Sequence, residues 1–373
     1  MKMLTKIYNK HKNQEELTKE ELMFLYEIDS EIISFGYGKD PRIGKIINKR
    51  NIKKDLAFLY ETSEDRISLT EEEALQGNKK YHYGYLDLRE WSTITDLVFP
   101  EEIGGYLDLE HLKIIENVVF PKKVRGYLDL RYLISTKSLI LPEEIYADLY
   151  LNNLVDVTGI TFPKRIGQKL FLSGLINVDS LVLPEYIGDS LIIGELLTAK
   201  YLRMPKEIGG DLRLNSLTSS EDLILPKVIG GDLDLNSLTS ASGLVFPDFI
   251  GGYLDLGKVT SSEGLKLPKK IGDFLDLRNL TNDKELVLPE EIGGDLDLSG
   301  LNNSKGLIFP KIIDGDLFLN SLTSCEGIIL PKNEQGEFYI PGHIVYCNFT
   351  KEELIEAAKR TEENQMKLDR VKN

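Results

Sequence analysis

The prolines of this chain recur at a fixed spacing, which constrains the fold more than any other feature. They occupy every twenty-first position over eleven steps, without insertion or deletion, at Pro100, Pro121, Pro142, Pro163, Pro184, Pro205, Pro226, Pro247, Pro268, Pro289, Pro310 and Pro331. Such a period is typical of repeat proteins, because one short unit cannot bury its apolar face without stacking on its neighbours. The sequence therefore predicts a solenoid over residues 81–340.

Leucines repeat in phase with the prolines. Leucines stand seven and nine residues after a proline, as Leu254 and Leu256 do after Pro247. A leucine–polar–leucine alternation indicates a half-buried strand, and the glycine pair that often precedes it provides a bend. We expect a second, short strand just before each proline, because proline then ends the ladder. Counting strands from Leu86 to Phe338 gives about 13 rungs.

The segment from Leu288 to Leu301 shows the full pattern Leu-Pro-x-x-Ile-x-x-x-Leu-x-Leu-x-x-Leu. This pattern resembles bacterial leucine-rich repeats, and the resemblance covers about residues 81–340. It implies recognition of a ligand across the exposed face of the main sheet, and it implies no enzymatic activity. The asparagine usual in that family is absent, and the third leucine takes its place. A horseshoe and a two-sided parallel β-solenoid therefore both remain open.

The two ends of the chain, residues 1–80 and 341–373, lie outside the repeat. Residues 1–80 are predicted to be helical, because Thr18 and Glu21 form a capping-box pattern before an apolar run. This region is either a cap over the open edge of the stack or a separate binding domain. The pair Thr350 and Glu353 predicts a charged helix within a C-terminal cap. The predicted fold class is mainly β, a parallel stack with helical ends.

Charge and composition exclude several classes of protein. The net charge of -15 arises within residues 81–340, since acidic and basic residues balance in both flanking regions. Such a surface disfavours binding to nucleic acid or anionic lipid and fits a basic partner. The chain has no apolar run long enough to span a membrane and no apparent secretory signal. With only Cys325 and Cys347 it also lacks a disulfide framework, so we expect a cytoplasmic protein.

Motifs for catalysis or metal binding are absent from the sequence. None of the four histidines stands at metal-ligand spacing from a carboxylate or a second histidine, and no nucleophile or phosphate-binding motif occurs. We therefore expect no enzyme, no cofactor and no metal. An ice-binding face is also disfavoured, because the paired Ser/Thr columns are interrupted.

Aspartates dominate two columns that point outward from the predicted main strand. We call the following six residues the acidic stripe: Asp232, Asp234, Asp255, Asp276, Asp295 and Asp297. Stacked carboxylates about 5 Å apart repel by up to about 1 kcal/mol per pair, so their retention needs a reason. They are either inherited from one duplicated ancestral unit or form a surface for a basic partner or divalent cations.

The outward column between the leucines becomes apolar for three rungs, at Tyr150, Phe171 and Ile192, and then cationic at Arg213. Lys169 stands in the neighbouring outward column. Apolar clusters bordered by charge mark interfaces, although drift in degenerating repeats would give the same sequence. We predict that these five residues bind a partner.

A third column, two residues before the prolines, is mostly aliphatic. We call it the Val/Ile column, and it comprises Val98, Val119, Ile140, Val182, Ile224, Val245, Val287, Ile308 and Ile329. If it faces outward, it invites homodimerisation or packing by another element. High β-propensity would explain the same residues equally well.

The function that the sequence favours is a non-catalytic protein–protein interaction module that binds through the exposed face of the main sheet. The alternative is an acidic nucleic-acid mimic, whose carboxylates imitate duplex phosphates and occupy a DNA-binding protein. DNA should displace such a partner, and salt should weaken its binding strongly.

Overall fold

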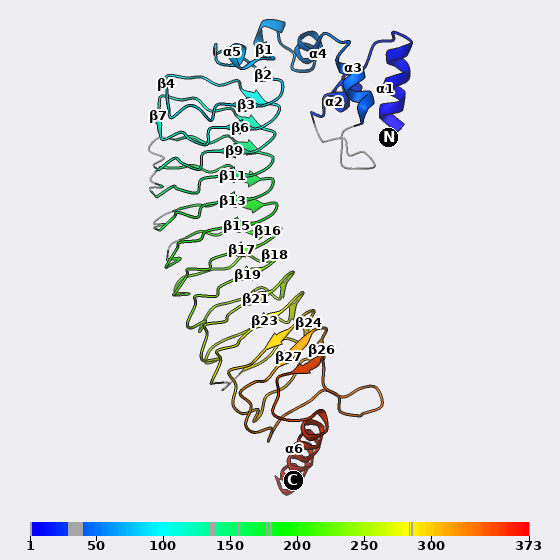
Figure 1. The fold of residues 1–373 in the computed structure, drawn as a ribbon, viewed down its shortest axis with the longest axis vertical. Coiled ribbons are helices and arrows are strands. Elements are labelled where there is room, and N and C mark those ends of the chain that lie inside the picture. The colour runs from blue at the N-terminus through cyan, green and yellow to red at the C-terminus, as the bar shows by residue number, and fades with distance from the viewer. Residues whose placement is uncertain are drawn as a thin grey trace. The chain divides into compact units, whose positions relative to one another are not determined.

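The computed structural model describes residues 2–28, 40–134, 139–155, 157, 159–176, 178, 181–200, 202–282, 284 and 286–372. The protein is mainly β, and its parallel sheets stack as a β-solenoid of about 11 turns, with helices before it and one helix after it (Figure 1). The predicted fold class is confirmed. The chain divides into two compact units, Met1–Leu130 with Ile140–Ala147 and Arg131–Leu139 with Asp148–Asn373.

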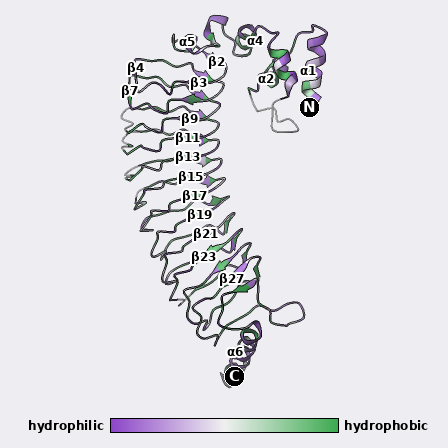
Figure 2. Cartoon of the chain, viewed as in Figure 1, coloured by the Kyte–Doolittle hydropathy of each residue, from purple (hydrophilic) through white to green (hydrophobic). Residues whose placement is uncertain are grey.

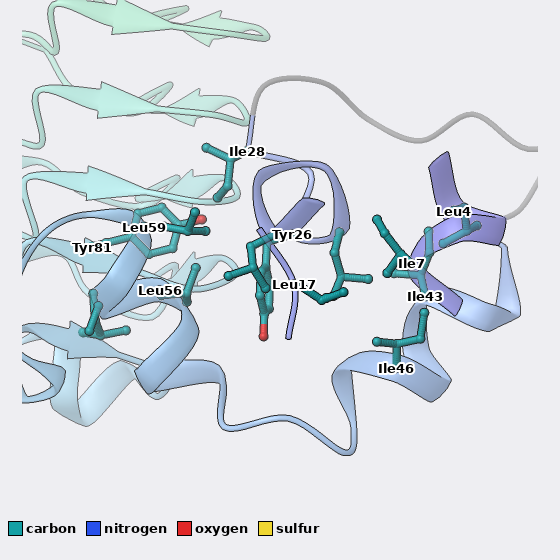
Figure 3. Packing of buried hydrophobic residues seen from close by; sticks show 14 residues of the cluster. Leu4, Ile7, Leu17, Tyr26, Ile28, Ile43, Ile46, Leu56, Leu59 and Tyr81 are labelled. Atoms are coloured by element: carbon teal, nitrogen blue, oxygen red, sulfur yellow. The ribbon is translucent and has the colours of Figure 1, made fainter. Parts of the chain in front are cut away.

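The first unit begins with short helices: α1 (Lys2–Lys12), α2 (Lys19–Leu25), α3 (Pro41–Ile47), α4 (Ile52–Leu59), the 3-10 turn η1 (Glu64–Arg66) and α5 (Glu71–Ala74). Thr18 caps α2 through the predicted capping box with Glu21. Helices α1 to α4 share a buried apolar cluster with Ile67 and Tyr81, which belong to the first two strands (Figure 3). The ring of Tyr60 stacks on that of Tyr81 with centroids 4.4 Å apart. The helical region thus packs directly on the strands of its own unit.

Each repeat contributes to two parallel sheets. The Leu sheet holds the strands that begin at the first leucine of each pair; in the first unit these are β3 (Leu86–Asp87), β6 (Leu107–Asp108) and β9 (Leu128–Asp129). The Ile sheet begins with β1 (Ile67–Ser68) and β2 (Tyr81–His82) and continues with the strands that end three residues after a proline. In the first unit these are β5 (Glu102–Ile103), β8 (Lys123–Val124) and β10 (Glu144–Ile145). A small sheet pairs β4 (Thr93–Thr95) with β7 (Ile114–Glu116).

The second unit continues both patterns, and its successive strands stack one above another (Figure 1). Its Leu sheet comprises β11 (Leu149–Tyr150), β13 (Leu170–Phe171), β15 (Leu191–Ile192), β17 (Leu212–Arg213), β19 (Leu233–Asp234), β21 (Leu254–Asp255), β23 (Leu275–Asp276), β25 (Leu296–Asp297), β27 (Asp316–Phe318) and β28 (His343–Val345). Its Ile sheet comprises β12 (Arg165–Ile166), β14 (Tyr186–Ile187), β16 (Glu207–Ile208), β18 (Val228–Ile229), β20 (Phe249–Ile250), β22 (Lys270–Ile271), β24 (Glu291–Ile292) and β26 (Ile312–Ile313).

The register follows the sequence period. Leu149 pairs with Leu170 and Leu170 with Leu191, so equivalent residues of successive repeats lie on neighbouring strands. The inward leucines are fully buried, as are Ile250 and Val259. Hydrophobic and hydrophilic residues occur side by side within the strands (Figure 2), as expected when alternate side chains point into and out of the core. The structure therefore has a sheet on two sides of its core, which resolves the choice left open by the leucine-rich-repeat pattern in favour of a two-sided solenoid.

The predicted position of the second strand is wrong. The regular strands of the Ile sheet follow each proline, whereas the residues before the prolines form only isolated parallel bridges, such as Val98 with Val119 and Ile308 with Ile329. Proline lacks the N–H that a ladder needs, but the residues beyond it keep theirs. The N–H of Gly251 accordingly donates to the carbonyl oxygen of Ile229, on the preceding rung, at 3.1 Å.

The predicted last rung at Phe338 is also wrong. After Pro331 the chain makes a tight excursion, in which Lys332 bridges Phe338 in antiparallel fashion. The last strand of the Leu sheet is β28 instead, whose Ile344 pairs with Leu317 after a step longer than one repeat. The additional residues of this step form the loop around the Lys332–Phe338 bridge before β28 pairs with the Leu sheet. Helix α6 (Lys351–Lys372) then follows, as predicted for the C-terminal region.

Candidate functional site

The three apolar residues of the column between the leucines, and the arginine that follows them, lie on consecutive strands of the Leu sheet in the second unit. Tyr150 pairs with Phe171, Phe171 with Ile192, and Ile192 with Arg213. The rings of Tyr150 and Phe171 stack with centroids 4.7 Å apart and planes 9° apart. The structure therefore brings together the predicted residues of this column as one continuous surface. Its geometry follows from the parallel register, which sets equivalent side chains one strand spacing apart.

This column is less exposed than its sequence pattern suggests. Tyr150, Phe171 and Ile192 are each half-buried, whereas Arg213 is exposed. Stacked rings cover each other's faces, and the guanidinium carbon of Arg131 lies 5.1 Å from the centroid of the Tyr150 ring. The aromatic pair is therefore held in a fixed position, so these side chains lose less conformational entropy when a partner binds.

A surface pocket of about 250 Å³ lies at the aromatic pair. Its lining comprises Arg131, Tyr132, Tyr150, Asn152, Asn153 and Phe171. The hydroxyl of Tyr150 donates to Oδ2 of Asp148 at 2.8 Å. The side-chain oxygen of Asn152 is buried and accepts no hydrogen bond from the described residues. A buried acceptor without a donor is costly, so the buried oxygen of Asn152 is a local source of instability next to the aromatic surface.

A second aliphatic column lies on these three rungs and on the rung before them, and it was missed by the sequence analysis. Directly after the third leucine of each repeat, the chain carries Ile134, Val155, Ile176 and Leu197, which are between 44% and 58% exposed. On the following rungs the same position holds Thr218, Thr239, Thr260 and Thr281, all of them exposed. The change from aliphatic residues to threonine along this column is the signal that could have revealed it. Two outward columns thus become apolar over the same part of the second unit.

The cations at the border of this surface are already paired. Nη2 of Arg213 lies 3.0 Å from Oδ2 of Asp211, and this hydrogen bond raises the pKa of the Arg213 guanidinium. Nζ of Lys169 lies 3.9 Å from Oδ2 of Asp189, a long ion pair between half-exposed groups. Exposed pairs of this kind contribute little to stability, so both cations can exchange partners at small cost. They border the apolar surface, as the sequence predicts.

Four aspartates of the acidic stripe close turns in the backbone. Asp234, Asp255, Asp276 and Asp297 each accept a hydrogen bond from the backbone N–H two residues further along the chain, at 2.8 to 3.1 Å. This is the geometry by which aspartate stabilises a turn at the end of a strand. Asp276 is almost fully buried and also pairs with Arg278. Turn formation thus gives a local reason for repeating aspartate in this column.

The other two members of the stripe link neighbouring rungs. Asp232 and Asp295 accept hydrogen bonds from the backbone N–H of Tyr253 and Asp316, at 3.1 and 2.7 Å, each on the next rung. Burial raises the pKa of Asp232, and it does the same for Asp255. All six carboxylates are therefore engaged by the backbone, and their role toward a partner or cation remains a prediction. Among the described residues, no group of three or more His, Cys, Asp or Glu side chains could hold a metal ion.

The first unit carries an aromatic ladder of its own. Tyr85, Tyr106 and Tyr127 stack with successive centroid distances of 4.7 and 4.6 Å. The hydroxyl of Tyr127 donates to Oδ2 of Asp108 at 3.1 Å. Burial of the phenol raises the pKa of Tyr106 and of Tyr127, as does the nearby carboxylate of Asp108. On the rungs of Tyr85 and Tyr106, the position of the aliphatic column holds Ser92 and Lys113, so we regard the surface of the second unit as the better candidate site.

Comparisons with known proteins give no relative. No family model matches the chain, and no curated protein or solved structure is similar to it. Within the described ranges, no helix combines the length and the apolar character needed to cross a membrane.

Proposed function

We propose that this protein is a non-catalytic, leucine-rich-repeat-like interaction module that acts in the cytoplasm. It binds a protein partner through the outward face of the Leu sheet, on the rungs from Ile134 to Arg213. The observation that carries the proposal is that two outward columns are apolar together on three consecutive rungs, those of Tyr150, Phe171 and Ile192. Drift of single repeats would alter the two columns independently, whereas an interface requires both to change together.

The chemistry of the surface indicates what the partner presents. An apolar side chain fits the pocket beside Tyr150 and Phe171. A polar group close to that side chain would meet Asn152 and Asn153, which line the pocket. The acidic surface outside this patch favours a basic protein, because opposite charge accelerates encounter. We therefore expect a basic segment with an apolar anchor to bind here.

The proposal is tested with two triple variants of the full chain. The patch variant changes Tyr150, Phe171 and Ile192 to serine. Both variants and the wild type are immobilised and used to capture proteins from host-cell lysate, and circular dichroism verifies that each is folded. A specific protein retained by the wild type and lost by the patch variant supports the proposal.

The matched control changes Asp234, Asp255 and Asp297 to asparagine. Asparagine keeps an acceptor for the turn hydrogen bonds but removes three charges. Our proposal requires the control to retain the partner with moderately reduced affinity. If the control loses the partner while the patch variant retains it, and duplex DNA and salt both release the partner, the nucleic-acid mimic replaces the interaction module as the function.

A further inference from the structure

The Val/Ile column faces outward and is uncovered in the second unit. Its members there are Val182, Ile224, Val245, Val287, Ile308 and Ile329, with exposed fractions between 38% and 77%. The flanking residues of each segment are buried: Leu223 and Leu225 lie in the core on either side of Ile224. The core therefore does not require aliphatic residues at the outward positions between them.

Strand propensity does not explain the choice of these residues. Threonine is also β-branched and favours strands, and this chain uses it in the exposed column of Thr218, Thr239 and Thr260. The same chain thus places polar β-branched residues on one exposed column and aliphatic ones on another. An aliphatic column at this level of exposure indicates a surface that becomes covered.

The outward columns of the two sheets have a different chemistry. On the Ile sheet, Lys270 pairs with Glu291 on the next rung at 2.6 Å, so neighbouring charges of opposite sign satisfy each other. On the Leu sheet, the outward positions hold aspartates and aromatic rings. The Val/Ile column is interrupted in the second unit only by Thr161, Arg203 and Lys266.

The charges that border the column fit a second copy on four of its eight rungs, although Lys269, Glu290 and Lys332 also pair within the chain. On four rungs, the residue three positions before the column residue and the residue three positions after it carry charges of opposite sign. These pairs are Glu221 and Lys227, Glu263 and Lys269, Lys284 and Glu290, and Glu326 and Lys332, and all of them are exposed. The rungs of Arg203 and Ile308 instead have lysine on both sides, and the rung of Val182 has two acidic residues. Opposite charges thus border the column on four rungs, against three with like charges.

We propose that the second unit forms a homodimer through the Val/Ile column, with the two stacks parallel and related by a twofold axis along the stack. This axis sets each edge of the column against the opposite edge of the second copy. Glu221 then faces Lys227 of the second copy, and the reverse contact forms as well, as a twofold interface requires. An antiparallel arrangement would set each edge against itself and lose this pairing within a rung.

The period and the size of the surface also fit a second copy. Two ladders with the same strand spacing of about 4.8 Å stay in step along the stack, as in-register sheets do, so their aliphatic rungs can interdigitate. Val182 and Ile329 are seven repeats apart, which is roughly 34 Å. Eight rungs with three positions each supply 24 positions, and a standard interface uses about 20–30 residues from each partner.

The test is the mass of the full chain in solution, measured by sedimentation over a concentration series. The dimer variant changes Ile224, Val245 and Val287 to threonine, which keeps β-branching as in the chain's own threonine columns. We expect the wild type at twice the mass of one chain, and a dissociation constant at least about tenfold higher for the variant. A matched control changes Ile134, Ile176 and Leu197 to threonine and should remain dimeric. A monomeric wild type, or a control that dissociates while the dimer variant does not, would overturn the proposal.

The charged edges test the parallel arrangement separately. Changing Glu221 and Glu263 to lysine should weaken the dimer, because both edges of these rungs then carry positive charge. Adding Lys227→Glu and Lys269→Glu should restore it, since the edges are again opposite. If the second pair of changes weakens the dimer further, the twofold axis proposed here is wrong. These experiments measure mass and not partner capture, so their outcome is independent of the proposed partner-binding surface.

Discussion

Replacing Gly251 by alanine should destabilise the second unit strongly. A Cβ atom added at Gly251 would lie 2.0 Å from the carbonyl oxygen of Gly230, its equivalent one rung earlier. An ordinary nonbonded contact is about 3.5 Å, so the two rungs must separate locally by roughly 1.5 Å. The neighbouring oxygen is backbone and belongs to the stacked ladder, so it cannot rotate away as a side chain could.

The magnitude follows from the hydrogen bonds that such a separation breaks. The N–H of Gly251 donates to Ile229 at 3.1 Å, and that of Gly252 donates to Gly231 at 2.8 Å, both across the step that must widen. Each lost bond costs about 1 kcal/mol, and more where a buried group is left unpaired. Together with the overpacking itself, we expect a loss of about 3 kcal/mol.

The measurement is urea unfolding followed by circular dichroism, with Gly194→Ala as the control. A Cβ at Gly194 meets nothing closer than 3.8 Å, and its φ is not in the left-handed region. This variant should be neutral or up to about 1 kcal/mol more stable, since alanine has less freedom to lose on folding. Equal unfolding midpoints for the two variants would refute the argument that close approach between rungs requires glycine at position 251.

Three further predictions concern charge and the pocket. Burial raises the pKa of Asp232 and Asp255, so the folded state binds protons at these carboxylates more tightly than the unfolded state does. The second unit should therefore gain stability as the pH falls from 7 through these raised pKa values. Hydrogen exchange at several pH values measures this, and a loss of stability in that range would contradict the shifts. Burial alone would raise the pKa of Glu21 in the first unit, but hydrogen bonds from Thr18 and Lys10 outweigh it and hold the pKa at about 2. The stabilisation of the folded state by ionised Glu21 is therefore complete above about pH 4.5 and is lost as the pH falls toward 2. Replacing Asn152 by leucine should raise the free energy of unfolding by about 1 kcal/mol, because its buried oxygen has no donor. Because Asn152 also lines the pocket, we expect weaker partner capture, and unchanged capture would exclude a role for this side chain.

The sequence by itself determined the repeat, the register and the core. A strict period, with a proline at every twenty-first position, allows only one register in which every leucine column points into the core. A shift of one residue would turn the inward side chains of each strand to the outside. The pairs Leu149–Leu170 and Leu170–Leu191 follow from this. The capping boxes at Thr18 and Thr350 were also readable, since their hydrogen bonds join residues only three positions apart.

The tertiary structure decided which of the repeated positions form strands and what the aspartates do. The period alone does not say whether the segment before or after the proline joins the second sheet, and the structure places it after, as at Phe249–Ile250. Likewise, the sequence shows Asp255 as an outward carboxylate, whereas its oxygen accepts the N–H of Gly257. Turn geometry sets this bond, and the pattern of apolar residues does not encode it.

The candidate site shows the same division between sequence and structure. The apolar column of Tyr150, Phe171 and Ile192 could be read directly, because periodicity assigns each residue to a face of the strand. The pocket could not, since it joins Arg131 from one rung with Asn152 and Phe171 from the two following rungs. Its shape depends on how the turns at the ends of the strands project their side chains, and only the packed stack of rungs fixes that.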